Sequence, residues 1–363
     1  IGTITTGSTP STSIPDYYSD DGIIWVTPTD ISENITFKSA RKLSELGQQV
    51  GRVVPKSTIL VTCIASIGKN TMLGNTGSFN QQINGLTPNE NKYEPYFLLI
   101  ESEIWSAQMR KSAAAGTMQI INRTEFSGLE TWIPKLNEQK VIGTYFRNLD
   151  NLITLHQRKL DRLKNIKKSM LDKMFPKDGE VVPEIRFKGF TDAWEQRKAK
   201  ELFVSTADKG YPELPVLSAT QDRGMIRRDE NSINIFHDKE NEAGYKRVLP
   251  GQFVIHLRSF QGGFAHSKIE GITSPAYTVF GFYELENHDS EYWKYVFTSK
   301  SFIRRLETVT YGIRDGRNIS YDEFLTLNFV YPPKAEQMAI ARYLDKLSNL
   351  IALHQRKSFD ILT

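Results

Sequence analysis

Residues 138–159 read EQKVIGTYFRNLDNLITLHQRK, and residues 336–357 read EQMAIARYLDKLSNLIALHQRK. About 13 of the 22 positions are identical, at an offset of about 198 residues and without a gap. The match continues more weakly upstream, where four residues of the first copy recur in the second: Ile121, Phe126, Leu129 and Pro134 answer to Ile319, Phe324, Leu327 and Pro332. This period is far longer than that of a solenoid repeat, so the chain is a tandem duplication of a globular block followed by a helix.

Both copies of the repeated segment have the apolar spacing of a helix that packs along a stripe. The first copy runs for about 38 residues, or roughly 57 Å, which is too long to be buried within one small domain. The two copies are therefore expected to pair with each other as an antiparallel coiled coil. The predicted helix-pairing and partner-binding positions are Ile142, Leu149, Leu152, Leu163, Ile340, Leu347 and Leu350.

His156 and His354 occupy equivalent positions on these apolar stripes. One interpretation is a metal ligand or a pH switch. The other is a core imidazole with a satisfied hydrogen bond. The second is favoured, because no acidic or cysteine ligand stands three or four residues away on the same face.

The chain has 363 residues, a net charge of +4 and 39% hydrophobic residues, which are globular proportions and suggest two or three domains. The charge is uneven: residues 1–139 carry about −2, residues 140–177 about +7 and residues 178–363 about −1. The basic segment lies on the first helix. It is either a solvated helix face or a surface that contacts a partner or phosphate groups.

Cys63 is the single cysteine, so the chain has no intrachain disulfide and fits a reducing cytoplasm. Apolar runs such as 59–64 are too short to span a bilayer, and no secretory leader opens the sequence. Because the first residue is Ile1, we expect trimming at the N-terminus. The second helix ends soon after Lys357, so the chain is either trimmed there too or has a shorter second helix.

Each globular block reads as mixed α and β. Strands are predicted at 23–27, 57–62 and near 252–257, and helices at 94–111 and near 290–307. Gly-punctuated loops after the strands concentrate Arg, Asn and Gln, which suit guanine and adenine edges, with Ser, Thr and Lys for phosphates. Taken singly, each of these residues is better explained as an ordinary solvated loop residue. The prediction depends on their concentration after a Gly-punctuated strand in both copies. The predicted DNA-binding residues are Thr27, Lys69, Asn70, Gln81, Gln82, Gln119, Arg123, Thr220, Gln221, Arg223, Arg258, Gln261, Arg314, Arg317 and Asn318.

Motifs for catalysis are missing from the sequence. Cys63 stands where a nucleotide-binding loop needs its first glycine, and Asn70 replaces the Ser or Thr that would reach magnesium. No metal-ligand spacing, cofactor glycine fingerprint or G-x-S-x-G elbow appears. The chain is therefore expected to be a recognition scaffold rather than an enzyme, with no metal or cofactor of its own.

Two variable blocks alternating with two near-identical helices closely resemble the specificity subunit of Type I restriction–modification systems. The join between the first helix and the second block, KMFP at 173–176 and PEIRFKGFTDAWEQRK at 183–198, is similar to that of Gram-positive members. The first block lacks its own WEQRK segment. The resemblance implies an α+β fold: a first target-recognition domain (1–133), a central conserved helix (134–177), a second target-recognition domain (178–331) and a distal conserved helix (332–363).

The resemblance further implies that each recognition domain reads one half of a bipartite double-stranded DNA target. The helices would set the spacing and dock two modification (methyltransferase) subunits, which restriction (translocase–nuclease) subunits then join. S-adenosylmethionine, ATP and magnesium would belong to those partners. Two other classes stay open on the residues alone: a stand-alone DNA-cleaving enzyme with fused recognition domains, and a coiled-coil adaptor that binds proteins only.

Overall fold

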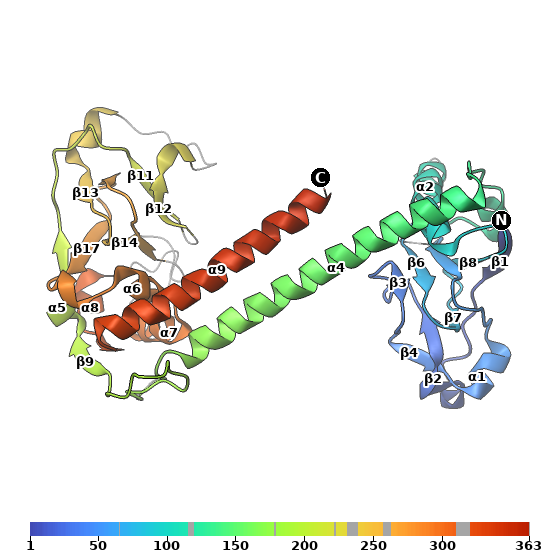
Figure 1. Cartoon of the computed structure of the whole chain (residues 1–363), viewed down its shortest axis with the longest axis horizontal. Helices are drawn as coiled ribbons and strands as arrows, with labels where there is room; N and C mark the ends of the chain where they lie inside the picture. Colours follow the sequence, from blue (N-terminus) through green and yellow to red (C-terminus); the bar gives the residue numbers. More distant parts are fainter. Residues whose placement is uncertain are drawn as a thin grey trace. The chain divides into compact units, whose positions relative to one another are not determined.

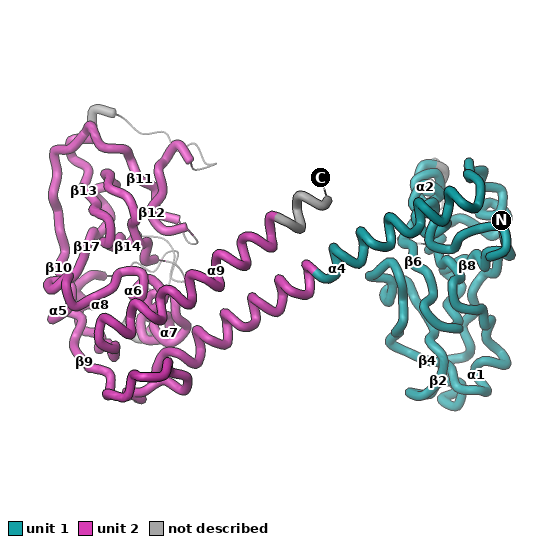
Figure 2. Tube along the Cα trace, viewed as in Figure 1, with its two compact units in different colours: residues 1–155 teal, residues 156–363 magenta. Residues whose placement is uncertain are grey.

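The computed structural model describes residues 1–64, 66–114, 120–177, 179–220, 223–230, 239–256, 263–309 and 320–362. The chain forms two compact units, residues 1–155 and residues 156–363 (Figure 2). Each contains an α+β block, and two long helices follow the blocks in the sequence (Figure 1). The predicted α+β class is confirmed, while the finer division at residues 133, 177 and 331 stays a prediction.

Unit 1 is built from short strands and three helices that precede the long helix. Its elements are β1 (Gly2–Thr6), η1 (Pro15–Tyr17), β2 (Tyr18–Val26), β3 (Ile35–Thr36), β4 (Arg41–Leu43), α1 (Glu45–Val50), β5 (Ile59–Thr62), β6 (Asn70–Leu73), β7 (Gly77–Phe79), β8 (Ile83–Pro88), α2 (Pro95–Ala114), α3 (Arg123–Ser127) and the start of α4 (Leu136–Lys173).

These strands form a five-stranded sheet in the order β1-β8-β5-β6-β3 and a three-stranded sheet in the order β4-β2-β7. Helix α2 packs on β5 and β6, and it buries Leu98 and Met109 completely. The start of α4 lies on the same core, where Ile142 and Phe146 pack against the buried cluster. Burial of these apolar side chains stabilises the block, at about 25 cal/mol per Å² removed from water.

Unit 2 contains the second block and the second long helix. Its elements are β9 (Glu195–Lys198), α5 (Ala199–Leu202), β10 (Phe203–Thr206), β11 (Leu217–Thr220), β12 (Gly224–Arg227), η2 (Arg228–Glu230), η3 (Lys239–Gly244), β13 (Lys246–Val248), β14 (Phe253–Ile255), β15 (Phe264–His266), β16 (Gly271–Thr273), β17 (Thr278–Phe282), η4 (Leu285–Asn287), α6 (Ser290–Phe297), α7 (Lys300–Val309), α8 (Tyr321–Phe324), β18 (Asn328–Tyr331) and α9 (Lys334–Leu362).

The sheets of unit 2 repeat the plan of unit 1. The order β10-β17-β14-β15 matches β1-β8-β5-β6, with every neighbouring pair antiparallel in both. The short helices α3 and α8 also correspond, because each begins 198 residues from the other and each has a side-chain N-cap, Asn122 and Ser320. The duplication read from the sequence is thus a duplication of fold.

The two long helices begin in the same way in both copies. In α4, the Gln139 side chain donates to the Pro134 carbonyl at 2.8 Å, and in α9, Gln337 donates to the Pro332 carbonyl at 2.8 Å. Helix α4 has 38 residues, which agrees with the length of about 38 residues predicted from the sequence. Within unit 2 the second part of α4 runs antiparallel to α9, which confirms the predicted coiled-coil pairing there (Figure 1).

Four of the five predicted elements of the blocks fall within a few residues of β2, β5, β14 and α2. The single helix predicted near 290–307 is wrong, because the structure has two helices there. Helix α6 ends where the Thr298 hydroxyl donates to the Lys294 carbonyl, and α7 begins where the Ser299 hydroxyl accepts from the Phe302 N–H. These hydroxyls satisfy backbone groups at the break, so a helix-period pattern can continue across it.

Candidate nucleic-acid interface

Several predicted DNA-binding residues of unit 1 come together at loops between its strands. The Asn80 N–H donates to the Val26 carbonyl at 3.0 Å, and the Lys69 ammonium donates to the Pro28 carbonyl at 3.5 Å. These bonds connect the loop after β2, the loop before β6 and the turn between β7 and β8. The predicted residues on this edge are Thr27, Lys69, Gln81 and Gln82.

The predicted DNA-binding residues of unit 1 differ in exposure and in whether their polar atoms already have hydrogen-bond partners. Lys69 and Gln81 are exposed, and Arg123 is exposed in the first turn of α3. Gln82 is half-buried, and its side-chain oxygen accepts from the Asn80 amide at 3.0 Å. Thr27 donates to the Asp30 carboxylate at 2.6 Å. Exposed cations are suited to phosphate oxygens, and the half-buried amide is held in one orientation, as base reading requires.

Asn70 is engaged at both ends of its amide group. It donates to the Glu103 carboxylate at 3.1 Å and accepts from the Ser106 hydroxyl at 2.8 Å. Both partners belong to α2, so Asn70 ties β6 to that helix. Contact with an adenine edge would require it to release these bonds.

Arg110 is a further cation at this edge that the sequence patterns did not indicate. It lies in α2, is exposed, and donates to the Gly68 carbonyl at 3.3 Å, beside Lys69. Gly68 has φ +85°, and a Cβ there would lie 2.3 Å from the Arg110 guanidinium, so only glycine permits this approach. Because Arg110 reaches the edge only through the packing of α2 on the sheet, no local motif could indicate it.

In unit 2 the described candidates lie at the turn of the β11–β12 hairpin. The Thr220 hydroxyl donates to the Gly224 carbonyl at 2.8 Å and accepts from the Arg223 N–H at 3.1 Å. The Arg223 side chain is exposed beside them. The other predicted residues lie outside the described residues: Gln119, Gln221, Arg258, Gln261, Arg314, Arg317 and Asn318.

His156 and His354 meet between the two long helices of unit 2. Their Nδ1 atoms are 3.3 Å apart, so one imidazole donates to the other, as expected for a core histidine with a satisfied hydrogen bond. These residues are 198 apart and therefore equivalent in the repeat. An antiparallel pair of copies brings one residue opposite its own equivalent, and here that residue is the histidine.

The predicted pairing positions differ in which core they join and in how far they are buried. Ile142 packs on the core of unit 1, and Ile340 lies in the core of unit 2. Leu347 is also buried, Leu149, Leu163 and Leu350 are half-buried, and Leu152 is 43% exposed.

Further along α4, Lys167 lies 5.7 Å from the centre of the Tyr295 ring. Burial lowers the pKa of Lys167, and nearby Lys294 lowers it further, while Asp345 raises it.

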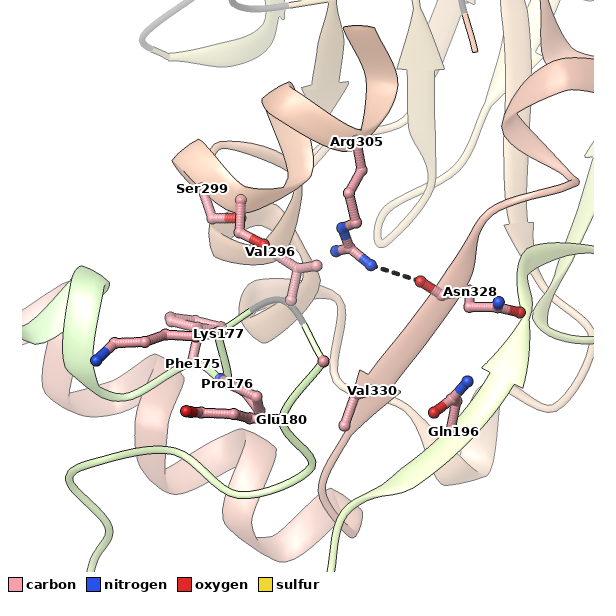
Figure 3. Close-up of a pocket in the computed structure, with 12 residues that line it drawn as sticks. Phe175, Pro176, Lys177, Glu180, Gln196, Val296, Ser299, Arg305, Asn328 and Val330 are labelled. Atoms are coloured by element: carbon pink, nitrogen blue, oxygen red, sulfur yellow. Dashed lines mark hydrogen bonds between the residues drawn. The ribbon is translucent and has the colours of Figure 1, made fainter. Parts of the chain in front are cut away.

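A cavity of about 320 Å³ in unit 2 lies between residues that follow α4, the junction of α6 and α7, and strands β9 and β18 (Figure 3). On its wall the Arg305 guanidinium donates to the Asn328 carbonyl at 2.6 Å (Figure 3). None of the predicted DNA-binding residues lines it.

No cluster of three or more potential metal ligands occurs among the described residues, and none of the described helices could cross a membrane. Cys63 is buried, which raises the pKa of its thiol, and it accepts from the Asn84 amide at 3.2 Å.

Comparison with a family model and with solved structures shows which known proteins this chain resembles. Residues 1–165 match the model of the Type I restriction modification DNA specificity domain. A crystal structure of the Type I restriction–modification S subunit from M. genitalium superimposes with a TM-score of 0.62, covering 99% of this chain and 90% of that one at 11% identity. The chain therefore has the fold of a specificity subunit, and the resemblance inferred from its helices and join is confirmed.

Two curated relatives agree with this family. The Type I restriction enzyme MjaIX specificity subunit of Methanocaldococcus jannaschii is 28% identical over 178 residues, which are 46% of this chain and 40% of the relative. The HindI specificity subunit of Haemophilus influenzae is 28% identical over 162 residues, 42% of this chain and 35% of the relative. Each alignment thus spans less than half of the relative's length.

Proposed function

We propose that this chain is the DNA sequence-specificity subunit of a Type I restriction–modification complex. Each α+β block reads one half of a bipartite double-stranded DNA target. The observation that carries the proposal is the duplication itself: a specificity domain in the first part of the chain and a second block with the same strand order. Two reading blocks on one chain suit a target with two halves.

In this proposal the chain supplies recognition and no catalytic step. Exposed Lys69, Arg110 and Arg123 contact phosphates, while amide and guanidinium groups of the loops read base edges. Modification subunits bind S-adenosylmethionine, and restriction subunits bind ATP and magnesium. Most of the DNA affinity comes from the assembled complex, because the reading blocks are close to neutral. The complex acts in the cytoplasm.

The DNA half of the proposal is tested by sequencing the methylated bases in cells that carry this chain with its modification and restriction partners. We expect one split, asymmetric motif. The double variant Gln81→Ala/Gln82→Ala should relax recognition in one half of the motif only, by about 1–3 kcal/mol for each lost bidentate contact. Gln49→Ala, at an exposed glutamine of α1, is the matched control. Equal loss at both halves, or methylation without sequence preference, contradicts the proposal.

The assembly half is tested on α4. Leu152 is 43% exposed, so Leu152→Asp should leave the chain folded but abolish copurification with the modification subunit. Asn151→Asp, one residue earlier and therefore on another face of the helix, should assemble normally. Normal assembly of the Leu152 variant would contradict the docking role of this stripe. DNA cleavage by the purified chain with Mg²⁺ alone would instead favour a stand-alone nuclease.

A further inference from the structure

The second half of α4 carries more positive charge than its surroundings in unit 2 neutralise. Residues 158–168 hold six Lys and Arg side chains and one carboxylate, Asp161. Lys167 is half-buried over the Tyr295 ring. The other five cations are exposed and form no ion pair within the described part of the chain: Arg158, Lys159, Arg162, Lys164 and Lys168. This excess charge is available to an anionic partner.

The one carboxylate in this run does not compensate its neighbours. Asp161 lies three residues after Arg158 and three before Lys164, a spacing at which side chains of a helix can pair. The structure has no ion pair between Asp161 and either of these two cations. The Asp161 carboxylate instead accepts from the Gln157 amide at 3.4 Å. Pairing within the helix therefore does not account for the cations.

Two of the exposed cations begin a row of hydrogen-bond donors along one side of α4. Arg158, Arg162, Asn165 and Ser169 follow one another at spacings of four, three and four residues, which places them on one face of the helix. These four residues are called the basic stripe below. They line a hollow of about 570 Å³ beside α4, whose other wall residues are Asp161, Ile166 and Met170.

The basic stripe lies on the side of α4 that points away from α9. His156 marks the contact between the two helices, because its Nδ1 atom is 3.3 Å from that of His354. At about 100° per residue, Arg158 lies about 200° and Arg162 about 240° around the helix from His156. Leu160, about 40° from His156, is 5% exposed. A partner can therefore reach the basic stripe without separating the two helices.

The side chains of the basic stripe suit phosphate oxygens. Arg, Asn and Ser are among the residues that bind the DNA backbone, and a guanidinium group offers a phosphate two parallel N–H groups. Duplex DNA carries one negative charge per about 1.7 Å of its axis. The two blocks are close to neutral, at about −2 and −1, so the positive charge comes from residues 140–177, at about +7.

The place of α4 in the chain indicates which part of the DNA supplies the phosphates. Helix α4 connects the first block to the second. In a bipartite target the spacer connects one half-site to the other. A helix that joins the two reading blocks therefore has the spacer, rather than the bases that are read, as its natural neighbour.

We propose that the basic stripe binds phosphate oxygens of the double-stranded DNA spacer between the two half-sites. This inference rests on the proposed reading function. Arg158 and Arg162 each bind a phosphate, and Asn165 and Ser169 donate to phosphate oxygens further along, over roughly 16 Å of helix. Because every base pair carries the same phosphates, this contact adds affinity without sequence preference.

The experiment measures binding of a duplex that carries the methylated motif to the complex of this chain with its modification subunits, over a range of salt concentrations. Arg158→Gln/Arg162→Gln removes both charges and keeps good helix formers. We expect binding to weaken about tenfold or more at low salt, and the slope of log K against log salt to decrease by about 2, because two phosphate contacts are lost. The methylated motif should stay the same in both halves.

Arg342→Gln/Lys346→Gln is the matched control. These two residues of α9 are exposed cations with the same spacing of four residues. This variant should bind the duplex like the unsubstituted chain and with the same salt dependence. Equal losses in the two double variants would indicate a general effect of net charge and would overturn the proposal.

Neutral methylphosphonates in place of the spacer phosphates locate the contact on the DNA. They should weaken binding by the unsubstituted chain but have little further effect on Arg158→Gln/Arg162→Gln, because both changes remove the same interaction. Losses that add in full would mean that the basic stripe and the spacer phosphates do not touch, which overturns the proposal.

Copurification separates DNA from a protein partner. Arg158→Gln/Arg162→Gln should copurify with the modification subunit in normal amounts, and a loss would mean that the basic stripe binds that subunit instead of DNA. If the double variant binds the duplex with unchanged affinity and salt dependence, this inference alone is overturned. If the complex of the unsubstituted chain binds no particular DNA sequence, the proposed reading function fails, and this inference fails with it.

Discussion

The Glu-Gln pair that opens each long helix has the same sequence in both copies but two environments. Gln139 accepts from the Glu94 N–H at 3.0 Å, and Gln337 accepts from the Asp289 N–H at 2.9 Å, so the glutamines act alike. Glu138 is exposed, whereas Glu336 is buried against Arg186. Contacts made inside one copy repeat with the sequence, whereas Glu336 also binds Arg186, which lies in residues 183–198 ahead of the second block.

The largest expected effect on stability comes from removing the Glu336 carboxylate. Glu336→Ala leaves the Arg186 guanidinium, 13% exposed, without its partner, so the free energy of unfolding of unit 2 should fall by about 3–5 kcal/mol. Glu138→Ala should leave unit 1 nearly unchanged. Denaturant unfolding followed separately in each unit by hydrogen exchange measures both. Similar losses in the two units would mean that Glu138 has a partner of equal importance.

Acid should destabilise unit 2 and spare unit 1, because all six histidines lie at or after residue 156. Burial lowers the pKa of His266 and of His288 to about 4, against opposing effects of Glu291 and Glu284. The unfolded chain therefore binds more protons between pH 6.5 and 4, so the stability of unit 2 decreases as the pH is lowered through this window.

From pH 7 to pH 5 the loss should be roughly 2 kcal/mol for each of these two histidines. Thermal unfolding of each unit at the two pH values measures it. His266→Gln should flatten the pH dependence of unit 2. An equal loss in both units would show that carboxylates, not these imidazoles, govern the response.

The long helices were the most predictable part of the fold, because mainly apolar residues recur at a spacing of seven in both copies, which is typical of a long helix that packs along one stripe. The strand order of the blocks was not predictable, since β8 and β17 pair with strands far away in sequence. The break between α6 and α7 depends on two hydroxyls at Thr298 and Ser299, which the apolar pattern does not register.

The candidate site was predictable as a set of loops but not as a geometry. Composition indicated Lys69 and Gln81, which the fold brings to one edge. It gave no signal for Arg110, whose place depends on how α2 packs. It also selected Asn70, whose amide is engaged with α2 on both sides, because residue type alone does not reveal a hydrogen-bond partner.

Two leucines of α4 lie on either side of His156 and differ in how far they are buried. Leu160 is 5% exposed and Leu152 is 43% exposed. Leu160→Ala should cost about 2–3 kcal/mol of unfolding free energy, because it removes a buried side chain and leaves a cavity. Leu152→Ala should cost less than half as much. Urea unfolding of both variants measures the difference, and equal costs would mean that Leu152 is buried in solution.

The smallest expected effects come from the helix caps that the two copies share. The Asn122 side chain accepts from the Glu125 N–H at 2.9 Å, and Ser320 accepts from the Glu323 N–H at 3.5 Å. Asn122→Ala should cost about 1 kcal/mol in unit 1, because it removes the side-chain oxygen that caps the helix through a bond of ordinary length. Ser320→Ala should cost less in unit 2, since its single bond is long. Thermal unfolding with Thr124→Ala as an exposed control measures both, and a larger cost at Ser320 would contradict this ranking. The duplication therefore predicts where the caps fall, while the bond geometry of each copy sets their strength.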